Sequence, residues 1–213
     1  NIETGFVDAA SQTVQQTVTL TVTANRGEVT VTKVFTIKVG ELQVSTIAEA
    51  LAGVKNDQFK VRATIIGGGY STYYIQDATG AIGLYVPSGL RDFFSANTGQ
   101  LIELVGTRDT YNGLNQLSTT TATLIEAGTL PAAVNVNGEA DLLPFQSQLI
   151  ELVAVEVTAK STDSYGNISL TLKDLSNNAL IAARWDSRYV IPAGLNTTLT
   201  GLVVGDIINI QAI

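Results

Sequence analysis

The feature that most constrains the fold is the stretch Thr72–Val86, in which two alternating runs of apolar and polar residues flank a tight turn. The turn is Asp77-Ala-Thr-Gly80, with glycine at its end. Alternation on both sides of a short, glycine-containing turn is typical of an antiparallel β-hairpin. The sequence therefore predicts two strands here, Ser71–Gln76 and Ala81–Val86.

The segment before this hairpin predicts a third strand, Phe59–Ile66, which ends in Gly67-Gly-Gly69. Glycines at that place allow a sharp bend in the strand. Three antiparallel strands with a bend after the first are how a small five-stranded OB barrel begins. The remaining elements expected for that barrel are a helix at Leu90–Ser95, strands Leu101–Arg108 and Ala122–Ala127, and a piece Leu114–Leu117 after the turn Asp109–Gly113.

A second set of similar elements follows Pro131 in the same order, which predicts a tandem duplication. Its members are Leu149–Thr158, Ile168–Asp174, Leu180–Trp185 and Gly205–Ile210. The last residue, Ile213, falls inside what should be the fourth strand, so we expect the second barrel to lack its last strand. Unpaired edges attract added strands, and we expect strand exchange there, with the N-terminal hairpin of this or another molecule as one partner.

The first forty residues predict a hairpin with one apolar face. Thr/Val alternation runs on both sides of the turn Asn25–Glu28, and Lys33 interrupts the apolar positions, which are Val18, Leu20, Val22, Val29, Val31, Phe35, Ile37 and Val39. Residues 12–40 resemble the last hairpin of the atrophied immunoglobulin-like repeats of bacterial surface proteins. A short helix over 46–52 should follow, with Ser45 as its N-cap and Gly53 as its stop.

The predicted fold is all-β: two tandem OB-like five-stranded barrels, the second incomplete, with an N-terminal immunoglobulin-like hairpin and short helices. The predicted domains are a partial hairpin and linker at 1–41, a first OB-like domain at 42–128 and a second at 129–213.

Composition limits the chemistry of the 213 residues. A formal charge of −7 opposes non-specific attraction to phosphate backbones. Cys, His and Met are absent, which excludes disulfides and zinc sites built on thiolate or imidazole. No apolar run approaches the ~20 residues that cross a bilayer, so we expect no membrane span. The absence of Cys fits either a reduced compartment or the outside of a Gram-positive-like cell. A weakly charged, threonine-rich β chain favours the extracellular or cell-surface location, with any signal and anchor outside these residues.

Residues 45–128 resemble the OB-like domains of secreted bacterial endonucleases and of Firmicutes and Mollicutes surface proteins. The residues that carry the resemblance are Ile47–Leu51, Val61–Ile65, Tyr74-Ile-Gln-Asp77 and Gly80–Val86. The second copy has Thr171-Leu-Lys-Asp174 at the most specific of these positions, which puts inherited binding there in doubt. The resemblance implies an accessory module, not a catalytic domain.

The candidate ligand-binding residues are aromatic or basic. If Val61, Ile75 and Leu84 face inward, then Arg62, Tyr74 and Tyr85 face outward on the three first strands, where OB folds stack bases or sugar rings. Tyr70 and Tyr111 would extend this face from loops, and Trp185 is a separate candidate in the second copy. The alternative interpretation is that the tyrosines cover a solvated sheet or an interdomain contact, and that Trp185 only packs.

Carboxylates are the only potential catalytic groups in quantity. Asp77, Asp109, Asp163 and Asp174 all lie at predicted turns, where Asp usually bonds its own backbone. No pair has the spacing of a shared catalytic site, and Asp163–Asn167 lacks the spacing of a calcium loop. We therefore expect no enzyme activity, no cofactor and no metal.

The expected function is a non-catalytic binding or spacer module of a larger secreted or cell-surface bacterial protein. The alternative is a single-stranded nucleic-acid-binding accessory module of an extracellular nuclease. The expected partners are adjacent domains of the same polypeptide and an oligonucleotide or glycan.

Overall fold

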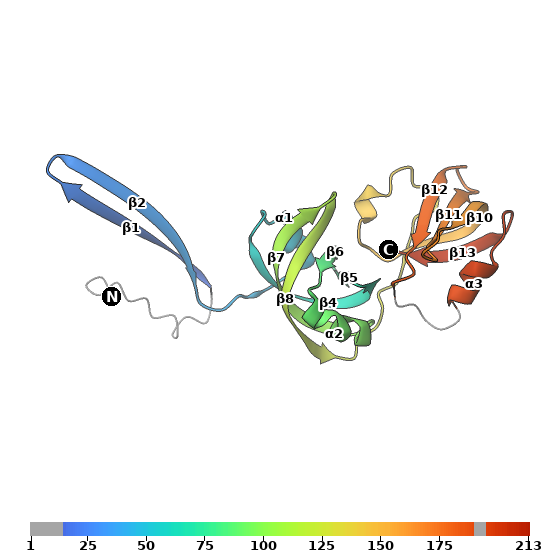
Figure 1. Ribbon diagram of the computed structural model, residues 1–213, viewed down its shortest axis with the longest axis horizontal. Coiled ribbons are helices and arrows are strands. Elements are labelled where there is room, and N and C mark those ends of the chain that lie inside the picture. Colours follow the sequence, from blue (N-terminus) through green and yellow to red (C-terminus); the bar gives the residue numbers. More distant parts are fainter. Residues whose placement is uncertain (1–14, 190–194) are drawn as a thin grey trace. The chain divides into compact units, whose positions relative to one another are not determined.

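The structure is a computed structural model that describes residues 15–189 and 195–213 (Figure 1). Its contacts divide the chain into two compact units, Asn1–Val44 and Ser45–Ile213. The second unit contains two separate sheets.

The first unit is a hairpin of β1 (Gln16–Arg26) and β2 (Val29–Val39), as the sequence predicts. The strands pair without interruption from Gln16 opposite Val39 to Arg26 opposite Val29. Leu20 lies opposite Phe35, so most of the apolar side chains share one face and the threonines share the other, where Val34 pairs with Thr21. Leu20 and Phe35 are 48% and 41% exposed, so the predicted apolar face is open to solvent in the described chain. An immunoglobulin-like origin of this hairpin stays a prediction.

The first sheet of the second unit has the strand arrangement of an OB-like barrel. Its order is β3-β4-β5-β6-β8-β7, and an additional pairing of β4 with β7 closes it. Among β4 to β8, neighbours pair antiparallel except β6 and β8, which run parallel. The strands are β3 (Val44–Ser45), β4 (Gln58–Gly69), β5 (Thr72–Asp77), β6 (Gly80–Tyr85), β7 (Leu101–Tyr111) and β8 (Leu114–Glu126).

Alternation along these strands builds the barrel interior, as predicted. Val61, Ile75 and Leu84 are completely buried, and they pack in one apolar cluster with Phe94. The glycine bend is also confirmed, because the register of β4 against β5 shifts between Ile65 and Gly67. The fifth strand differs from the expectation: it is one continuous strand rather than two pieces, because β-prone threonines bridge the pieces and pair with β7, with register shifts at Val105/Gly106 and Leu101/Ile102.

Short helices cover the barrel. Helix α1 (Ile47–Ala52) begins after Thr46, not Ser45 as predicted. Thr46 and Glu49 form a reciprocal capping box, which Ser45 lacks a partner to make. Helix α2 (Arg91–Ala96) follows the 3₁₀ turn η1 (Ser88–Leu90) and lies between the third and fourth barrel strands, where we expected a helix.

The second sheet repeats the order of β4 to β7, and the described residues contain no counterpart of β8 in it. It runs β12-β11-β10-β13, and the short β9 adds to β10 in parallel. Helix α3 (Leu195–Gly201) lies between β12 and β13, the position that α2 has in the first sheet, and the sequence did not predict it. The other elements are β9 (Val134–Asn135), η2 (Leu143–Phe145), β10 (Ile150–Thr162), β11 (Ile168–Asp174), β12 (Leu180–Trp185) and β13 (Ile207–Ala212).

Candidate functional site

The predicted ligand face lies on the outer surface of β5 and β6. Tyr73 is buried, with 1% of its surface exposed, so Tyr74 faces outward as predicted. Tyr74 pairs with Gly83, and Tyr85 lies two residues further along β6. The two tyrosines are therefore diagonal neighbours on one face of the sheet.

Arg62 does not join them. Its Nε lies 2.8 Å from Oε2 of Glu103, the residue directly opposite on β7. Tyr74, by contrast, pairs with Gly67 at the other end of β4. The Arg62 side chain is half-exposed, so this ion pair is a surface contact of small energetic value. Arg62 is consequently turned toward β7 and away from the tyrosines.

Tyr74 is half-buried and contacts Tyr189, which follows β12. Burial is the main cause that raises the pKa of the Tyr74 phenol to about 12. The electrostatic influence of Tyr189 and a side-chain hydrogen bond with Tyr189 raise the pKa of Tyr74 further. The phenol of Tyr74 is thus held neutral. It is partly covered by the segment after β12, which agrees with the interpretation that this tyrosine lies at an interdomain contact.

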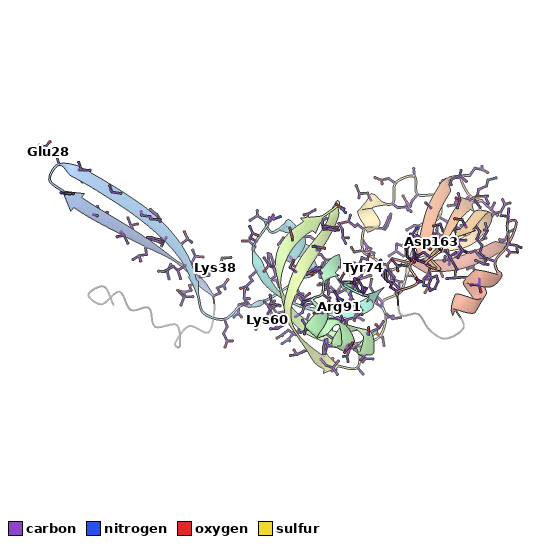
Figure 2. The ribbon with its side chains drawn as sticks, in the orientation of Figure 1. Glu28, Lys38, Lys60, Tyr74, Arg91 and Asp163 are labelled. Atoms are coloured by element: carbon purple, nitrogen blue, oxygen red, sulfur yellow. The ribbon has the colours of Figure 1, made fainter. Side chains whose placement is uncertain are left out.

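An exposed aromatic ring with two arginines lies beside this contact. Tyr70, in the turn between β4 and β5, is 54% exposed. The guanidinium carbon of Arg91 is 4.2 Å from the centre of its ring, and that of Arg188 is 5.1 Å away. These distances are within the range of cation–π attraction. We call Tyr70, Tyr74, Arg91, Arg188 and Tyr189 the tyrosine–arginine cluster; Figure 2 labels Tyr74 and Arg91.

The two arginines of the cluster differ in whether a carboxylate pairs with them. Arg188 Nη2 lies 2.6 Å from Oδ2 of Asp186, and its Nε donates to Oδ1 at 2.8 Å. The hydrogen bonds from Arg188 lower the pKa of Asp186 to about 2, and the carboxylate raises the pKa of Arg188 in return. Arg91 has a buried Nε with no hydrogen-bond partner among the described residues. Arg91 is therefore the arginine of the cluster that has an N–H group without an acceptor among the described residues.

The two other candidates lie apart from the cluster. Tyr111 ends β7 opposite Leu114 and is 65% exposed. Trp185 ends β12 and packs against the apolar core of the second sheet, as the packing interpretation expects. Its indole N–H is buried and has no acceptor within the described part of the chain.

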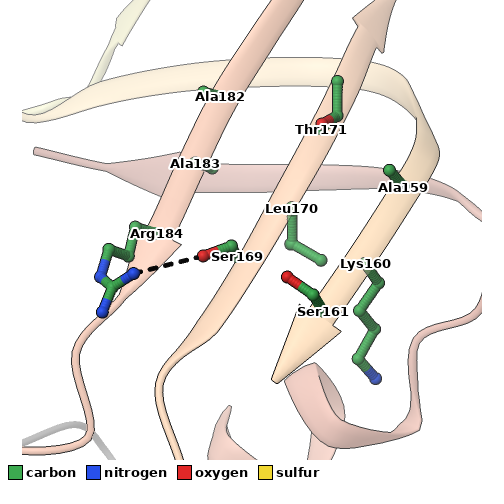
Figure 3. Close-up of a pocket in the computed structure, with 9 residues that line it drawn as sticks. All are labelled: Ala159, Lys160, Ser161, Ser169, Leu170, Thr171, Ala182, Ala183 and Arg184. Carbon is green, nitrogen blue, oxygen red and sulfur yellow. Dashed lines mark hydrogen bonds between the residues drawn. The ribbon is translucent and has the colours of Figure 1, made fainter. Parts of the chain in front are cut away.

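The second sheet has an open pocket of about 390 Å³ on three neighbouring strands (Figure 3). Its basic residues already have partners. Arg184 donates to Asp163 at 3.2 Å, and its Nη1 lies 3.5 Å from Ser169 Oγ. Lys160 Nζ donates to the carbonyl oxygens of Thr200 and Leu202. The lining residues are Ala159, Lys160, Ser161, Ser169, Leu170, Thr171, Ala182, Ala183 and Arg184.

The turn carboxylates bond the backbone of their own turns, as predicted. Asp77, Asp109, Asp163 and Asp174 each accept at least one hydrogen bond from a backbone N–H within three residues. Among the described residues, no three acidic side chains gather into a group that could hold a metal ion. In the same residues, no helix has the length and apolar character needed to cross a bilayer.

Comparisons with known proteins give little further information. No protein-family model matches the chain, and no curated protein is significantly similar to it in sequence. Among solved structures, the chain is similar to the hypothetical protein YgiW from E. coli, with 14% identity and a TM-score of 0.35. That match covers 40% of this chain and 91% of YgiW. A likeness at this TM-score carries no inference, and the OB-like assignment depends on the strand order described above.

Proposed function

We propose that this chain is a non-catalytic binding or spacer module of a larger secreted or cell-surface bacterial protein, built from a duplicated OB-like domain. The observation that carries the binding function is the exposed ring of Tyr70 with the Arg91 guanidinium 4.2 Å from its centre. An exposed aromatic ring with a guanidinium group over it offers stacking and hydrogen-bond donors to a planar ligand ring, such as a base or a sugar. The ligand surface would thus be centred on Tyr70, with Tyr85 nearby on the same barrel.

Contacts between the two sheets support the spacer function. Gln76 in β5 accepts a hydrogen bond from the backbone N–H of Leu149 at 3.0 Å. Gln146 accepts from the N–H of Asn115 and donates to the carbonyl of Gly113, both at 3.0 Å. Side-chain amides that bond the backbone of the other domain restrict its orientation, which suits a module that positions its neighbours.

Single-stranded nucleic-acid binding, as an accessory to an extracellular nuclease, is the second candidate. The cluster offers both elements that such binding uses, an aromatic stacking surface and guanidinium groups for phosphate. The formal charge of −7 and the pairing of Arg188 with Asp186 oppose it. We therefore rank it below sugar binding or spacing.

Ligand titration tests the binding function. The chain is titrated at low salt with a fluorescently labelled single-stranded oligonucleotide and is screened on a glycan array. Replacing Tyr70 by alanine should weaken binding of either ligand, by about 1–3 kcal/mol if one base stacks on the ring. The matched control is Tyr165→Ala, since Tyr165 is 82% exposed on a turn of the second sheet, outside the cluster. Failure of the unaltered chain to bind either ligand class would refute the binding function and leave only the spacer function.

A further inference from the structure

We propose that the outer face of the second sheet holds a second ligand site, which takes a sugar ring that carries a carboxylate. The site is the pocket of about 390 Å³ on β10, β11 and β12 (Figure 3). Its lining shares no residue with the tyrosine–arginine cluster. The inference therefore goes beyond the ligand surface centred on Tyr70 and does not depend on it.

Two rows of residues, most of them small, form the floor of this pocket. Thr171 lies between the buried Leu170 and Leu172, so its side chain points away from the core. Directly opposed residues of neighbouring strands share a face, so the partners of Thr171 and of Ser169 point outward with them. The two rows are Ser161–Ser169–Arg184 and Ala159–Thr171–Ala182.

Comparison with the first sheet shows why this face is hollow. The second strand of each sheet ends in an aspartate, and the residue three positions earlier is Tyr74 in the first sheet and Thr171 in the second. In the neighbouring row, the same alignment puts Arg184 at the place of Tyr85. A threonine where the first sheet has a tyrosine leaves the space of an aromatic ring open. The duplication has thus produced a covered tyrosine in one copy and an open pocket in the other.

The pocket is basic although the chain is acidic. Lys160 and Arg184 line it together with uncharged residues only, whereas the whole chain has a formal charge of −7. Lys160 Nζ donates to two carbonyl oxygens, which are neutral and leave its charge in place. Arg184 is half-exposed and reaches Asp163 through one nitrogen at 3.2 Å. Since a guanidinium has five N–H donors, Arg184 retains donors for the carboxylate of a ligand.

The uncharged part of the lining suits a sugar ring. Ser161, Ser169 and Thr171 contribute hydroxyl groups, which both donate and accept hydrogen bonds. Ala159 and Ala182 contribute methyl groups, against which the C–H groups of a pyranose ring can pack. The volume is near the lower end of the range of ligand pockets, about 300–1,000 Å³, and so suits one or two rings.

A sugar acid fits this lining better than a nucleic acid does. Among the described residues that line the pocket none is aromatic, so a base would find no ring on which to stack. An oligonucleotide would depend on phosphate contacts alone, which the net negative charge of the chain opposes. A carboxylate attached to a sugar ring, by contrast, can meet Arg184 while the ring hydroxyls meet Ser169, because these two residues are direct neighbours across β11 and β12.

Nuclear magnetic resonance titration with methyl β-glucuronide tests the inference, and methyl β-glucoside is the neutral counterpart. We expect the glucuronide to cause saturable shifts of the backbone amide signals of Ser169, Thr171 and Arg184. The glucoside should bind about fivefold more weakly, because it lacks the carboxylate. The amide signals of Tyr70 and Arg91 report on the other ligand surface in the same spectra, so failure of either site is distinguishable from failure of the other.

Three variants show whether the glycoside binds in the pocket. Thr171→Tyr introduces the residue of the first sheet, fills the hollow and should weaken glucuronide binding about tenfold or more. Arg184→Gln should abolish the preference for the glucuronide over the glucoside. The matched control is Lys173→Gln, which removes a positive charge from the same sheet outside the pocket lining and should leave that preference unchanged.

The amide spectrum of each variant shows whether it folds, and if Thr171→Tyr does not, the comparison of Arg184→Gln with Lys173→Gln still decides. Three results would overturn the inference: no saturable shift of the pocket amides at about 50 mM glucuronide, equal affinity of the unaltered chain for both glycosides, or an equal effect of Arg184→Gln and Lys173→Gln. Undiminished glucuronide binding by a folded Thr171→Tyr variant would overturn it as well.

Discussion

Asp174 accepts a hydrogen bond from the backbone N–H of Gly138, with its Oδ2 2.6 Å from that nitrogen. Asp77 does the same in the first sheet, where its Oδ2 lies 2.9 Å from the N–H of Ile47. Each aspartate ends the second strand of its sheet and also holds its own turn. In each sheet, the aspartate at this equivalent position therefore connects the segment before the barrel to the hairpin.

Replacing Asp174 by alanine should destabilise the second sheet by about 3 kcal/mol, because buried donors would lose their acceptor. The carboxylate is 1% exposed and also accepts hydrogen bonds from Ser176 and Asn137. Urea unfolding followed by Trp185 fluorescence measures this loss. The control is Asp141→Ala, which removes a single bond to the N–H of Leu143 from an exposed side chain and should cost less than about 1 kcal/mol. Equal midpoints for the two variants would contradict the prediction.

The stability of the second sheet should also fall in acid because of Asp174. Burial raises the pKa of this carboxyl, but the hydrogen bonds from Gly138, Ser176 and Asn137 outweigh burial and lower it to about 2. A folded-state pKa below the unfolded value of about 4 stabilises the fold above that value, and this stabilisation is lost as the pH falls toward 2. The loss amounts to about 2 kcal/mol. Urea unfolding at several pH values should show it in the unaltered chain, and Asp174→Asn should remove that part of the pH dependence.

Gly68→Ala should destabilise the first sheet by about 2 kcal/mol or more. Gly68 has a φ of +131°, and a Cβ there would lie 2.4 Å from the carbonyl oxygen of Thr72 and 2.5 Å from Cα of Tyr73. Because both contacts are to backbone, β4 and β5 would have to separate. Gly89→Ala is the control, since no atom lies within 4 Å of its added Cβ. Thermal unfolding compares them, and an unchanged midpoint for Gly68→Ala would refute the proposed bend.

Local patterns in the sequence were sufficient to predict most of the two sheets. Alternation identified which residues face inward, such as Val61, and the turn Asp77–Gly80 fixed the register of its hairpin. Helix α3 was missed because Asn and Thr are weak helix formers, so packing of Leu199 against the core decides that helix rather than propensity. The cap of α1 was predictable, since Glu49 stands three residues after Thr46 and completes a capping box.

The candidate site was less predictable than the fold. Outward positions of Tyr74 and Tyr85 follow from alternation, but the partners of these side chains do not. Arg62 turns to Glu103 because the barrel closes β7 onto β4, and Tyr189 reaches Tyr74 from the second sheet. The first contact depends on how the barrel closes and the second on how the two sheets pack, and no periodicity in the sequence encodes either.

The Tyr74–Tyr189 contact leads to a prediction at alkaline pH. The folded-state pKa of about 12 lies above the value of about 10 in an unfolded chain, so the unfolded state loses its proton first. The contribution of Tyr74 to stability should therefore be complete below pH 10 and decline as the pH rises toward 12. Tyr189→Phe removes the hydrogen bond and the electrostatic influence but not the burial, so it should lower the pKa of Tyr74 only part of the way. Near-ultraviolet titration of tyrosinate in the unaltered chain and in Tyr189→Phe measures this shift, with Tyr165→Phe as the control. If Tyr165→Phe lowered the pKa of the last tyrosine to titrate as much as Tyr189→Phe does, the Tyr74–Tyr189 contact would not be the cause of the raised pKa.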